Sequence, residues 1–455
     1  MNRHLAIFGA SGDLTTRYLF PALAHLHEQQ RLPDDFRVTA LGRGEMSPEE
    51  YRGSVGEWLA GYAGDVSEES RSRVAALTGY RQASVTDSGE LGEALGPPEE
   101  PVTVYLALPP AVFAPAIEAL SGAGLPEGSR VVVEKPFGES LESARELNRL
   151  LRGSFAENEV FRVDHFLALQ TVQNVLGTRF ANRVFEPVWN HQHVERVEVV
   201  WDETLALEGR AEYYDSAGAL KDMVQSHLLQ LLCLVGMEPP LSLGERDFRN
   251  RKAEVLRAVR RLSPEEVERQ TVRARYTSGT IGGEEVPAYA GEEGVDPDRE
   301  TETFVRVTLH VENWRWAGVP FVLRTGKALG EDRGEIAVHF RPVPHLSFGQ
   351  SRDPQPNVLR LQLGPDRLTL SVSVNGPGEG FAPEEVDLGS ELAPQELPAY
   401  GRLLLAVLEG DPTLSIRGDE AEESWRIVEP ILEAWGEGRV PLREYPAGSE
   451  GPEPR

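Results

Sequence analysis

Four short apolar runs in the first third of the chain constrain its fold more than any other feature. They cover residues 5–9, 37–41, 102–106 and 130–133, and each has the length and apolar content of a buried parallel strand. The stretches between them are amphipathic and predict helices at residues 19–28, 48–62, 67–77 and 140–151. Strands that alternate with helices in this way predict a doubly wound α/β sheet.

The rest of the chain has a different pattern. A strand is expected at residues 195–201 and a long helix with an apolar face at 219–234. Four later runs alternate as antiparallel strands do, at 304–311, 334–340, 357–363 and 367–374. Helices are expected at 399–409 and 421–435, and an exposed loop at 282–298. Because 455 residues exceed one typical core, two domains are expected.

Composition excludes several classes of partner. The formal net charge is −27, which repels nucleic acids and anionic lipid surfaces, so neither is expected to bind. An anionic substrate would need a local cationic pocket against this field. The single cysteine, Cys233, lies in an apolar stretch, so a buried thiol and a reducing cytoplasm are expected, without disulfides.

The first motif with chemical content follows the first predicted strand. Gly9-Ala10-Ser11-Gly12-Asp13-Leu14 joins that strand to a helix, and its small residues let backbone N–H groups approach a pyrophosphate. A tight turn capped by Asp13 is the structural alternative. Arg43 follows the second strand, where an arginine can meet the 2′-phosphate of NADP and an acidic residue would favour NAD. The alternative for Arg43 is a solvated surface charge.

Two further groups of residues indicate a catalytic site. Lys135 stands at the end of a strand, where open α/β sheets bind ligands, and it is one of only four lysines in the chain. Asp164-His165 forms one acid–base pair. Asp222 and His227 lie five residues apart on the long predicted helix, about 1.4 α-helical turns. A histidine oriented by a carboxylate makes a general base, although a lone histidine on an apolar helix is more often a core residue.

Six segments in order resemble those of glucose-6-phosphate dehydrogenases, and the resemblance covers essentially the whole chain. They are Gly9-Ala10-Ser11-Gly12-Asp13-Leu14, Glu134-Lys135-Pro136-Phe137-Gly138, Arg162-Val163-Asp164-His165, Glu208-Gly209-Arg210, Gln225-Ser226-His227-Leu228-Leu229-Gln230 and Leu323-Arg324-Thr325-Gly326-Lys327-Ala328-Leu329. The resemblance implies an N-terminal Rossmann domain, residues 1–163, and a C-terminal α+β domain, residues 164–455, for substrate binding and dimerisation. Its large, mostly antiparallel sheet would make a homodimer or homotetramer.

The resemblance also implies a reaction and a set of site residues. C1 of an aldohexose would be oxidised to a 1,5-lactone. The hydride acceptor would be NADP, with NAD as the alternative, and no metal is expected. His227 would accept the C1 hydroxyl proton and Asp164 would orient it. The sugar would meet Lys135, Glu203, Asp222, Lys327 and Gln362, with His165 near the phosphate. The cofactor would meet Gly9, Ser11, Gly12, Asp13, Leu14, Arg43, Pro109, Lys135 and Pro136.

The chain departs from the family at the phosphate end of the sugar. The family has His-Tyr-Leu-Gly-Lys-Glu where this chain has His165-Phe166-Leu167-Ala168-Leu169-Gln170, so a hydroxyl and an ammonium are replaced by Phe166 and Leu169. A hydrogen bond to a charged group contributes ~1.5–3 kcal/mol, so phosphate binding would weaken roughly 10²–10³-fold.

Three interpretations follow from this departure. The first is a sugar dehydrogenase whose substrate has an uncharged or altered C6 end. The second is an ordinary glucose-6-phosphate dehydrogenase of the oxidative pentose phosphate pathway, which holds the phosphate through His165 and another basic residue such as Arg333. The third is a non-catalytic sugar or cofactor sensor, which the intact Asp164, His227 and Lys135 disfavour.

Overall fold

The chain forms two compact units in the computed structural model, which describes residues 1–96, 100–207, 211–345, 355–364, 366–377 and 382–452. The first unit comprises Met1–Gln170, Pro240–Arg249 and Gln395–Glu422. The second comprises Thr171–Pro239, Asn250–Pro394 and Glu423–Arg455. The first unit therefore contains a segment from late in the chain, which the sequence pattern does not indicate.

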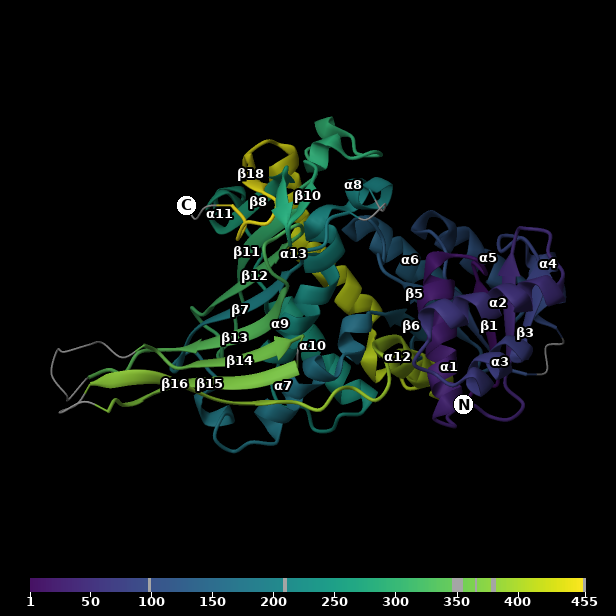
Figure 1. Ribbon diagram of the computed structural model, residues 1–455, viewed down its shortest axis with the longest axis horizontal. Helices are drawn as coiled ribbons and strands as arrows, with labels where there is room; N and C mark the ends of the chain where they lie inside the picture. Colours follow the sequence, from purple (N-terminus) through teal and green to yellow (C-terminus); the bar gives the residue numbers. More distant parts are fainter. Residues whose placement is uncertain (97–99, 208–210, 346–354, 365, 378–381, 453–455) are drawn as a thin grey trace. The chain divides into compact units, whose positions relative to one another are not determined.

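A seven-stranded sheet in the order β17-β6-β5-β4-β1-β2-β3 organises the first unit. Figure 1 labels β6, β5, β1 and β3 of this sheet. The four predicted strands are confirmed to within one residue at each end, as β1 (His4–Phe8), β2 (Arg37–Gly42), β4 (Val102–Leu106) and β5 (Arg130–Glu134). The pattern missed β3 (Thr78–Gln82) and β6 (Val160–Val163), which extend the parallel sheet, and β17 (Ser415–Ile416), which pairs antiparallel with β6.

The missed strands lack a continuous apolar sequence. In β6, Arg162 is fully buried. Its guanidinium meets Glu157 at 2.8 Å and donates to Asn148 at 3.0 Å. A buried arginine needs such partners, because an unpaired charge in the interior is costly.

The five helices predicted in the first unit are confirmed, whereas the helices at Ser88–Leu95 and Phe113–Ala123 were not predicted. The capping box of Ser47 and Glu50 begins α2 (Pro48–Tyr62), as helix-start chemistry requires. The core includes α1 and α12, which pack against each other. The elements are η1 (Thr15–Leu19), α1 (Phe20–Glu28), α2, α3 (Glu68–Leu77), α4 (Ser88–Leu95), η2 (Pro110–Val112), α5 (Phe113–Ala123), α6 (Leu141–Ser154), η3 (Glu157–Glu159), η4 (His165–Ala168), α12 (Ala399–Glu409) and η9 (Pro412–Leu414).

A nine-stranded sheet in the order β16-β15-β14-β13-β7-β12-β11-β8-β18 organises the second unit (Figure 1). Its pairs are antiparallel except β7–β12 and β8–β18, which are parallel. The strands are β7 (Val194–Asp202), β8 (Thr271–Thr277), β11 (Phe304–His310), β12 (Pro320–Gly326), β13 (Arg333–Phe340), β14 (Val358–Leu363), β15 (Asp366–Asn375), β16 (Pro383–Glu391) and β18 (Leu442–Pro446). Five were predicted, whereas β8, β12, β16 and β18 were not.

The remaining helices lie in the second unit or extend across its sequence limits. They are α7 (Gln170–Phe180), η5 (Glu186–Val188), α8 (Ala211–Ala219), η6 (Leu220–Leu228), α9 (Leu229–Gly236), α10 (Glu245–Ala258), α11 (Pro264–Gln270), η7 (Tyr289–Gly291), η8 (Pro297–Arg299) and α13 (Gly418–Gly436). Among the described residues, no helix combines the length and apolar character needed to cross a bilayer.

Two expectations about local structure hold only in part. The helix expected at residues 219–234 is present, but its first part, η6, is a π-helix, and only the second part, α9, is α-helical. The loop expected at residues 282–298 contains half of a hairpin, in which β9 (Gly279–Ile281) pairs with β10 (Glu284–Val286). Gly282 and Gly283 both have positive φ, which suits the two central residues of such a tight turn.

Candidate active site

The first unit places the predicted cofactor residues at one edge of its sheet. Gly9, Arg43, Pro109 and Lys135 follow β1, β2, β4 and β5, respectively. These strands are parallel neighbours, so their carboxyl ends lie at the same edge. The strand order reverses between β1 and β4, which is the point where doubly wound sheets bind dinucleotides.

The turn after β1 is shaped by Gly9. Its φ is +95°, and a Cβ there would lie 2.1 Å from the carbonyl oxygen of Ala107 in the loop after β4. The carbonyl oxygen of Gly9 accepts hydrogen bonds from the Gly12 N–H at 3.1 Å and the Thr15 hydroxyl at 2.8 Å. These bonds lead the chain directly into η1, while the side chains of Ser11 and Asp13 are exposed. The result is a close backbone turn at a helix start, the form of a pyrophosphate site.

The loop after β2 presents Arg43. Its side chain is exposed, and its carbonyl oxygen accepts a hydrogen bond from the Gln82 side chain at 3.1 Å. The neighbouring Gly44 carbonyl oxygen accepts one from the Tyr80 hydroxyl at 2.5 Å. These bonds fix the backbone while the guanidinium stays at the surface.

Glu134 forms a buried polar contact directly before Lys135. Its carboxylate accepts a hydrogen bond from the Tyr105 hydroxyl at 2.5 Å. Burial raises the pKa of Glu134 to about 7, and the Tyr105 hydrogen bond and the Lys135 charge oppose this shift. The Lys135–Pro136 peptide bond is cis. From the sequence, Glu134 belonged to a motif but had no assigned role, and its place at the end of a buried strand beside the motif lysine was the available signal.

The segment after β6 carries Asp164, which is 1% exposed. Its carboxylate accepts a hydrogen bond from the Phe166 N–H at 3.0 Å and so caps η4. The His165 ring stacks on Tyr400 of α12, with ring centroids 5.6 Å apart. Phe166 is buried, whereas Leu169 is partly exposed. The carbonyl oxygen of Ala168, next to Leu169, accepts a hydrogen bond from the Arg402 guanidinium at 3.4 Å.

The second unit brings together two predicted sugar-binding residues, Glu203 and Lys327. They follow β7 and β12, the parallel neighbours in its sheet. The Lys327 ammonium lies 2.7 Å from a Glu203 carboxylate oxygen and 5.4 Å from the centre of the Tyr214 ring. Lys327 is only 6% exposed, so its charge requires the partner that Glu203 supplies. The pair offers both acceptors and donors to sugar hydroxyls.

The π-helix η6 carries Asp222 and His227 and packs against β12. In a π-helix the backbone bonds join residues five positions apart, which is the spacing of these two residues. Asp222 and His227 are therefore separated by about one turn of this helix, whereas α-helical geometry had implied about 1.4 turns. Asp222 is partly exposed and accepts a hydrogen bond from the Tyr213 hydroxyl at 3.4 Å, whereas His227 is 1% exposed.

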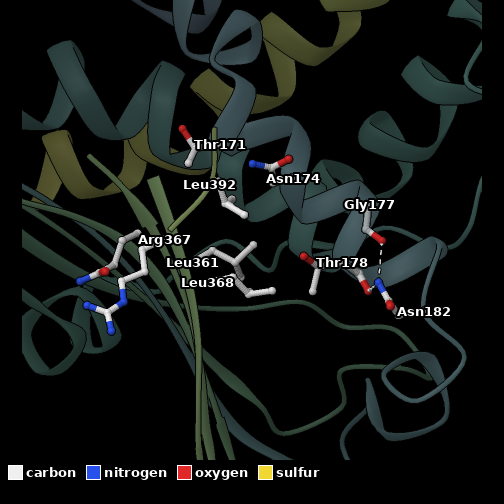
Figure 2. Close-up of a pocket in the computed structure, with 10 residues that line it drawn as sticks. Thr171, Asn174, Gly177, Thr178, Asn182, Leu361, Arg367, Leu368 and Leu392 are labelled. Atoms are coloured by element: carbon white, nitrogen blue, oxygen red, sulfur yellow. Dashed lines mark hydrogen bonds between the residues drawn. The ribbon is translucent and has the colours of Figure 1, made fainter. Parts of the chain in front are cut away.

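Gln362 lies on β14, three strands from β12, about 14 Å by the usual strand spacing. It pairs in register with Arg367 of β15, so the two share a face of the sheet. The next pair along, Leu361 and Leu368, lines a cavity of about 220 Å³ beside α7. Figure 2 shows these two leucines directed toward α7 and the Arg367 guanidinium directed away from it.

Arg333, the basic residue considered for the phosphate, is engaged within the second unit. Its guanidinium forms an ion pair with Glu335. The preceding residue, Asp332, accepts hydrogen bonds from the N–H and hydroxyl of Thr204, at 2.7 and 3.0 Å. The segment Glu208-Gly209-Arg210, one of the six motifs, lies outside the described residues.

Family models match almost the whole chain. Residues 6–174 match the glucose-6-phosphate dehydrogenase NAD binding domain, and residues 176–455 match the glucose-6-phosphate dehydrogenase C-terminal domain. The chain belongs to the glucose-6-phosphate dehydrogenase family. It is accordingly an NAD(P)-dependent oxidoreductase with a Rossmann domain and a mostly antiparallel C-terminal sheet.

Individual relatives in this family match over nearly their full lengths. Glucose-6-phosphate 1-dehydrogenases of Mycolicibacterium smegmatis and Treponema pallidum are each 41% identical, covering 98% of this chain and 93% and 92% of theirs. A crystal structure of glucose-6-phosphate 1-dehydrogenase from Mycobacterium avium is 36% identical and superimposes with a TM-score of 0.86 over 99% of this chain and 95% of that one. A glucose-6-phosphate dehydrogenase in complex with glucose-6-phosphate gives 31% identity and a TM-score of 0.90, covering 99% and 96%.

Substitution of Gly9 tests the turn after β1. We expect Gly9→Ala to lower the melting temperature and to abolish NADP binding, because its Cβ would collide with the Ala107 carbonyl oxygen in a strained backbone conformation. Gly12→Ala is the matched control for folding, since its Cβ would meet no atom closer than 3.4 Å. Thermal unfolding and NADP titration measure both effects. A Gly9→Ala protein with unchanged melting temperature and NADP affinity would contradict this account of the turn.

Proposed function

We propose that the protein is a glucose-6-phosphate 1-dehydrogenase, which oxidises C1 of glucose 6-phosphate to the 1,5-lactone and reduces NADP. The observation that carries this proposal is the match to relatives of that name at 41% identity over 98% of the chain. It favours the second interpretation of the phosphate end over an uncharged sugar. The proposal assigns cofactor binding to residues 1–163, and sugar binding to residues 164–455 together with Lys135.

The proposed chemistry uses residues from several segments of the chain. NADP supplies the acceptor for the C1 hydride. His227 accepts the proton of the C1 hydroxyl, and Asp164 orients the imidazole and stabilises its charged form. Lys135, Glu203, Asp222 and Lys327 hold the sugar hydroxyls. The Glu203–Lys327 ion pair supports this assignment, because a pre-paired acid and base provide a rigid set of acceptors and donors.

The phosphate is assigned to His165 and Arg402. Arg402 is a basic side chain whose guanidinium meets the segment that contains Leu169, through the Ala168 carbonyl oxygen. Arg333 already forms an ion pair with Glu335 within the second unit. The missing hydroxyl at Phe166 is weaker evidence against phosphate binding, because this ring is buried. A buried aromatic ring contributes packing whether or not it carries a hydroxyl.

We also propose a homodimer formed through the nine-stranded sheet, in the cytoplasm. The sheet face that bears Gln362 and Arg367 also carries the Glu198–His339 pair, 3.2 Å apart. Charged pairs on a sheet face can set the register of a second copy. The single cysteine, Cys233, is buried and free, which suits a reducing compartment.

A panel of sugars tests the substrate. With NADP present, we expect glucose 6-phosphate to have a kcat/KM at least about 10²-fold above that of glucose, the contribution of a charged phosphate contact. Absorbance of the reduced cofactor measures the rates. Preference for an unphosphorylated hexose would overturn the proposal.

The Leu169→Lys variant is the matched control for that panel. If His165 and Arg402 already bind the phosphate, restoring the family lysine changes the preference for glucose 6-phosphate little. A large gain confined to phosphorylated sugars would instead show that the wild-type phosphate site is deficient.

Replacement of His227 tests the general base. His227→Asn keeps a polar side chain but cannot accept the proton near neutral pH, so kcat should fall about 10²–10⁴-fold while the NADP affinity stays unchanged. Steady-state kinetics and NADP titration provide the two readings. Retention of wild-type kcat would remove His227 from the mechanism.

Replacement of Arg43 tests the cofactor preference. Arg43→Ala removes the exposed guanidinium beside the expected 2′-phosphate, so KM for NADP should rise roughly 10-fold or more while KM for NAD changes little. Arg3→Ala is a control, because Arg3 is an exposed arginine that pairs with Asp35 at the surface. Equal changes in KM for both cofactors would contradict the assignment.

A further inference from the structure

The segment Thr301–Thr303, which precedes β11, connects the beginning of η6 to the loop that carries Lys327. It does so through three hydrogen bonds, two to the start of η6 and one to the backbone of Lys327. The carbonyl oxygen and the carboxylate of Glu302 accept hydrogen bonds from the N–H groups of Ala219 and Leu220, at 3.1 and 2.9 Å. The carbonyl oxygen of Thr303 accepts one from the Lys327 N–H at 2.9 Å.

The segment is itself held in place from both sides. The Tyr445 hydroxyl donates to the Lys327 carbonyl oxygen at 2.6 Å and lies 2.9 Å from the Thr303 hydroxyl. The Thr301 hydroxyl donates to the carbonyl oxygen of Asp215 in α8 at 2.7 Å. The segment is therefore a rigid connection between η6 and Lys327 rather than a loose loop.

Glu302 contributes a carboxylate where most interior positions would carry an apolar group. It is 7% exposed, and burial raises its pKa to about 7 while the Leu220 hydrogen bond opposes the shift. A Cβ on Gly218 would lie 2.6 Å from a Glu302 carboxylate oxygen. Gly218 also has a φ of +68°. The absence of a side chain at Gly218 and its left-handed backbone conformation therefore both make room for the Glu302 carboxylate. The first N–H groups of a helix lack partners within it, and an acceptor there fixes where the helix starts.

We propose that Glu302 is a positioning residue for the sugar site: its carboxylate fixes the start of η6, and with it Asp222 and His227, relative to Lys327. Asp222 lies two residues after the bonded Leu220, and η6 packs against β12, which ends one residue before Lys327. The assignment rests on the proposed function, in which Asp222, His227 and Lys327 meet the same sugar. Groups on two separate elements act together only when their spacing is held to a fraction of an ångström.

Two variants of Glu302 separate positioning from general stability. Glu302→Ala leaves the Leu220 N–H without its acceptor, whereas the amide oxygen of Glu302→Gln can still accept that hydrogen bond. We expect Glu302→Ala to lower kcat/KM for glucose 6-phosphate about 10–100-fold, with NADP affinity unchanged. Glu302→Gln should stay within roughly threefold of wild type. Glu312→Ala is the matched control, since it removes an exposed carboxylate of the same unit.

A titration of His227 provides a reading that needs no turnover. Histidine-labelled protein would be followed by NMR against pH, with His227→Asn identifying the signal. The His227 midpoint should move in Glu302→Ala and be restored in Glu302→Gln. The proposal is overturned if Glu302→Ala keeps the wild-type kinetics and the wild-type His227 titration. It is also overturned if Glu302→Gln loses as much kcat/KM as Glu302→Ala. A third contrary result is a loss of sugar binding, NADP binding and melting temperature together, which would indicate a general loss of stability. A wild-type protein inactive on glucose 6-phosphate would instead reject the proposed function, while the titration would still test Glu302.

Discussion

Parallel strand pairing determines where the proposed site residues of this protein lie. Parallel neighbours end at the same edge, so residues far apart in sequence meet there without any local sequence contact. In the first unit this applies to Gly9, Arg43, Pro109 and Lys135. In the second unit the sheet is mostly antiparallel, yet Glu203 and Lys327 follow the parallel pair β7 and β12. Both units therefore use the same geometric device, although their topologies differ.

The buried charged groups at these edges would be unstable without partners that pair with them or hydrogen-bond to them. Lys327 has Glu203, and the Glu302 carboxylate has the Leu220 N–H. Glu134 has the Tyr105 hydroxyl, and burial raises its pKa together with that of Glu302. A buried ion pair is weak evidence of stability, because an apolar replacement of equal volume often serves as well. Its retention at the strand ends is better explained by the need to hold polar groups in fixed positions for a ligand.

Sequence patterns predicted the parts of the fold in which local preference and tertiary packing agree. The strand β4 and the helix α2 were predicted at their observed limits, because a mostly apolar strand and a capped helix carry their own signals. The strand β6 was missed because the buried Arg162 depends on Glu157 and Asn148, which no periodicity reveals. The π-helical form of η6 was missed because its residues are ordinary helix formers. Glu302 was missed because its partner, Leu220, is 82 positions away in the sequence.

The proposed phosphate end depends on more of the chain than the segment after β6. Phe166 and Leu169 suggested two lost phosphate contacts, and a basic residue from elsewhere in the chain, such as Arg333, was the alternative. The structure adds Arg402, which α12 delivers from more than two hundred residues further along the chain to the Ala168 carbonyl oxygen. Charge near a ligand is set by the tertiary neighbourhood and not by one segment, since an ion interacts appreciably over several ångströms in a low-dielectric environment. A missing lysine in a motif therefore predicts a weaker phosphate site only when the elements packed around that motif supply no other cation.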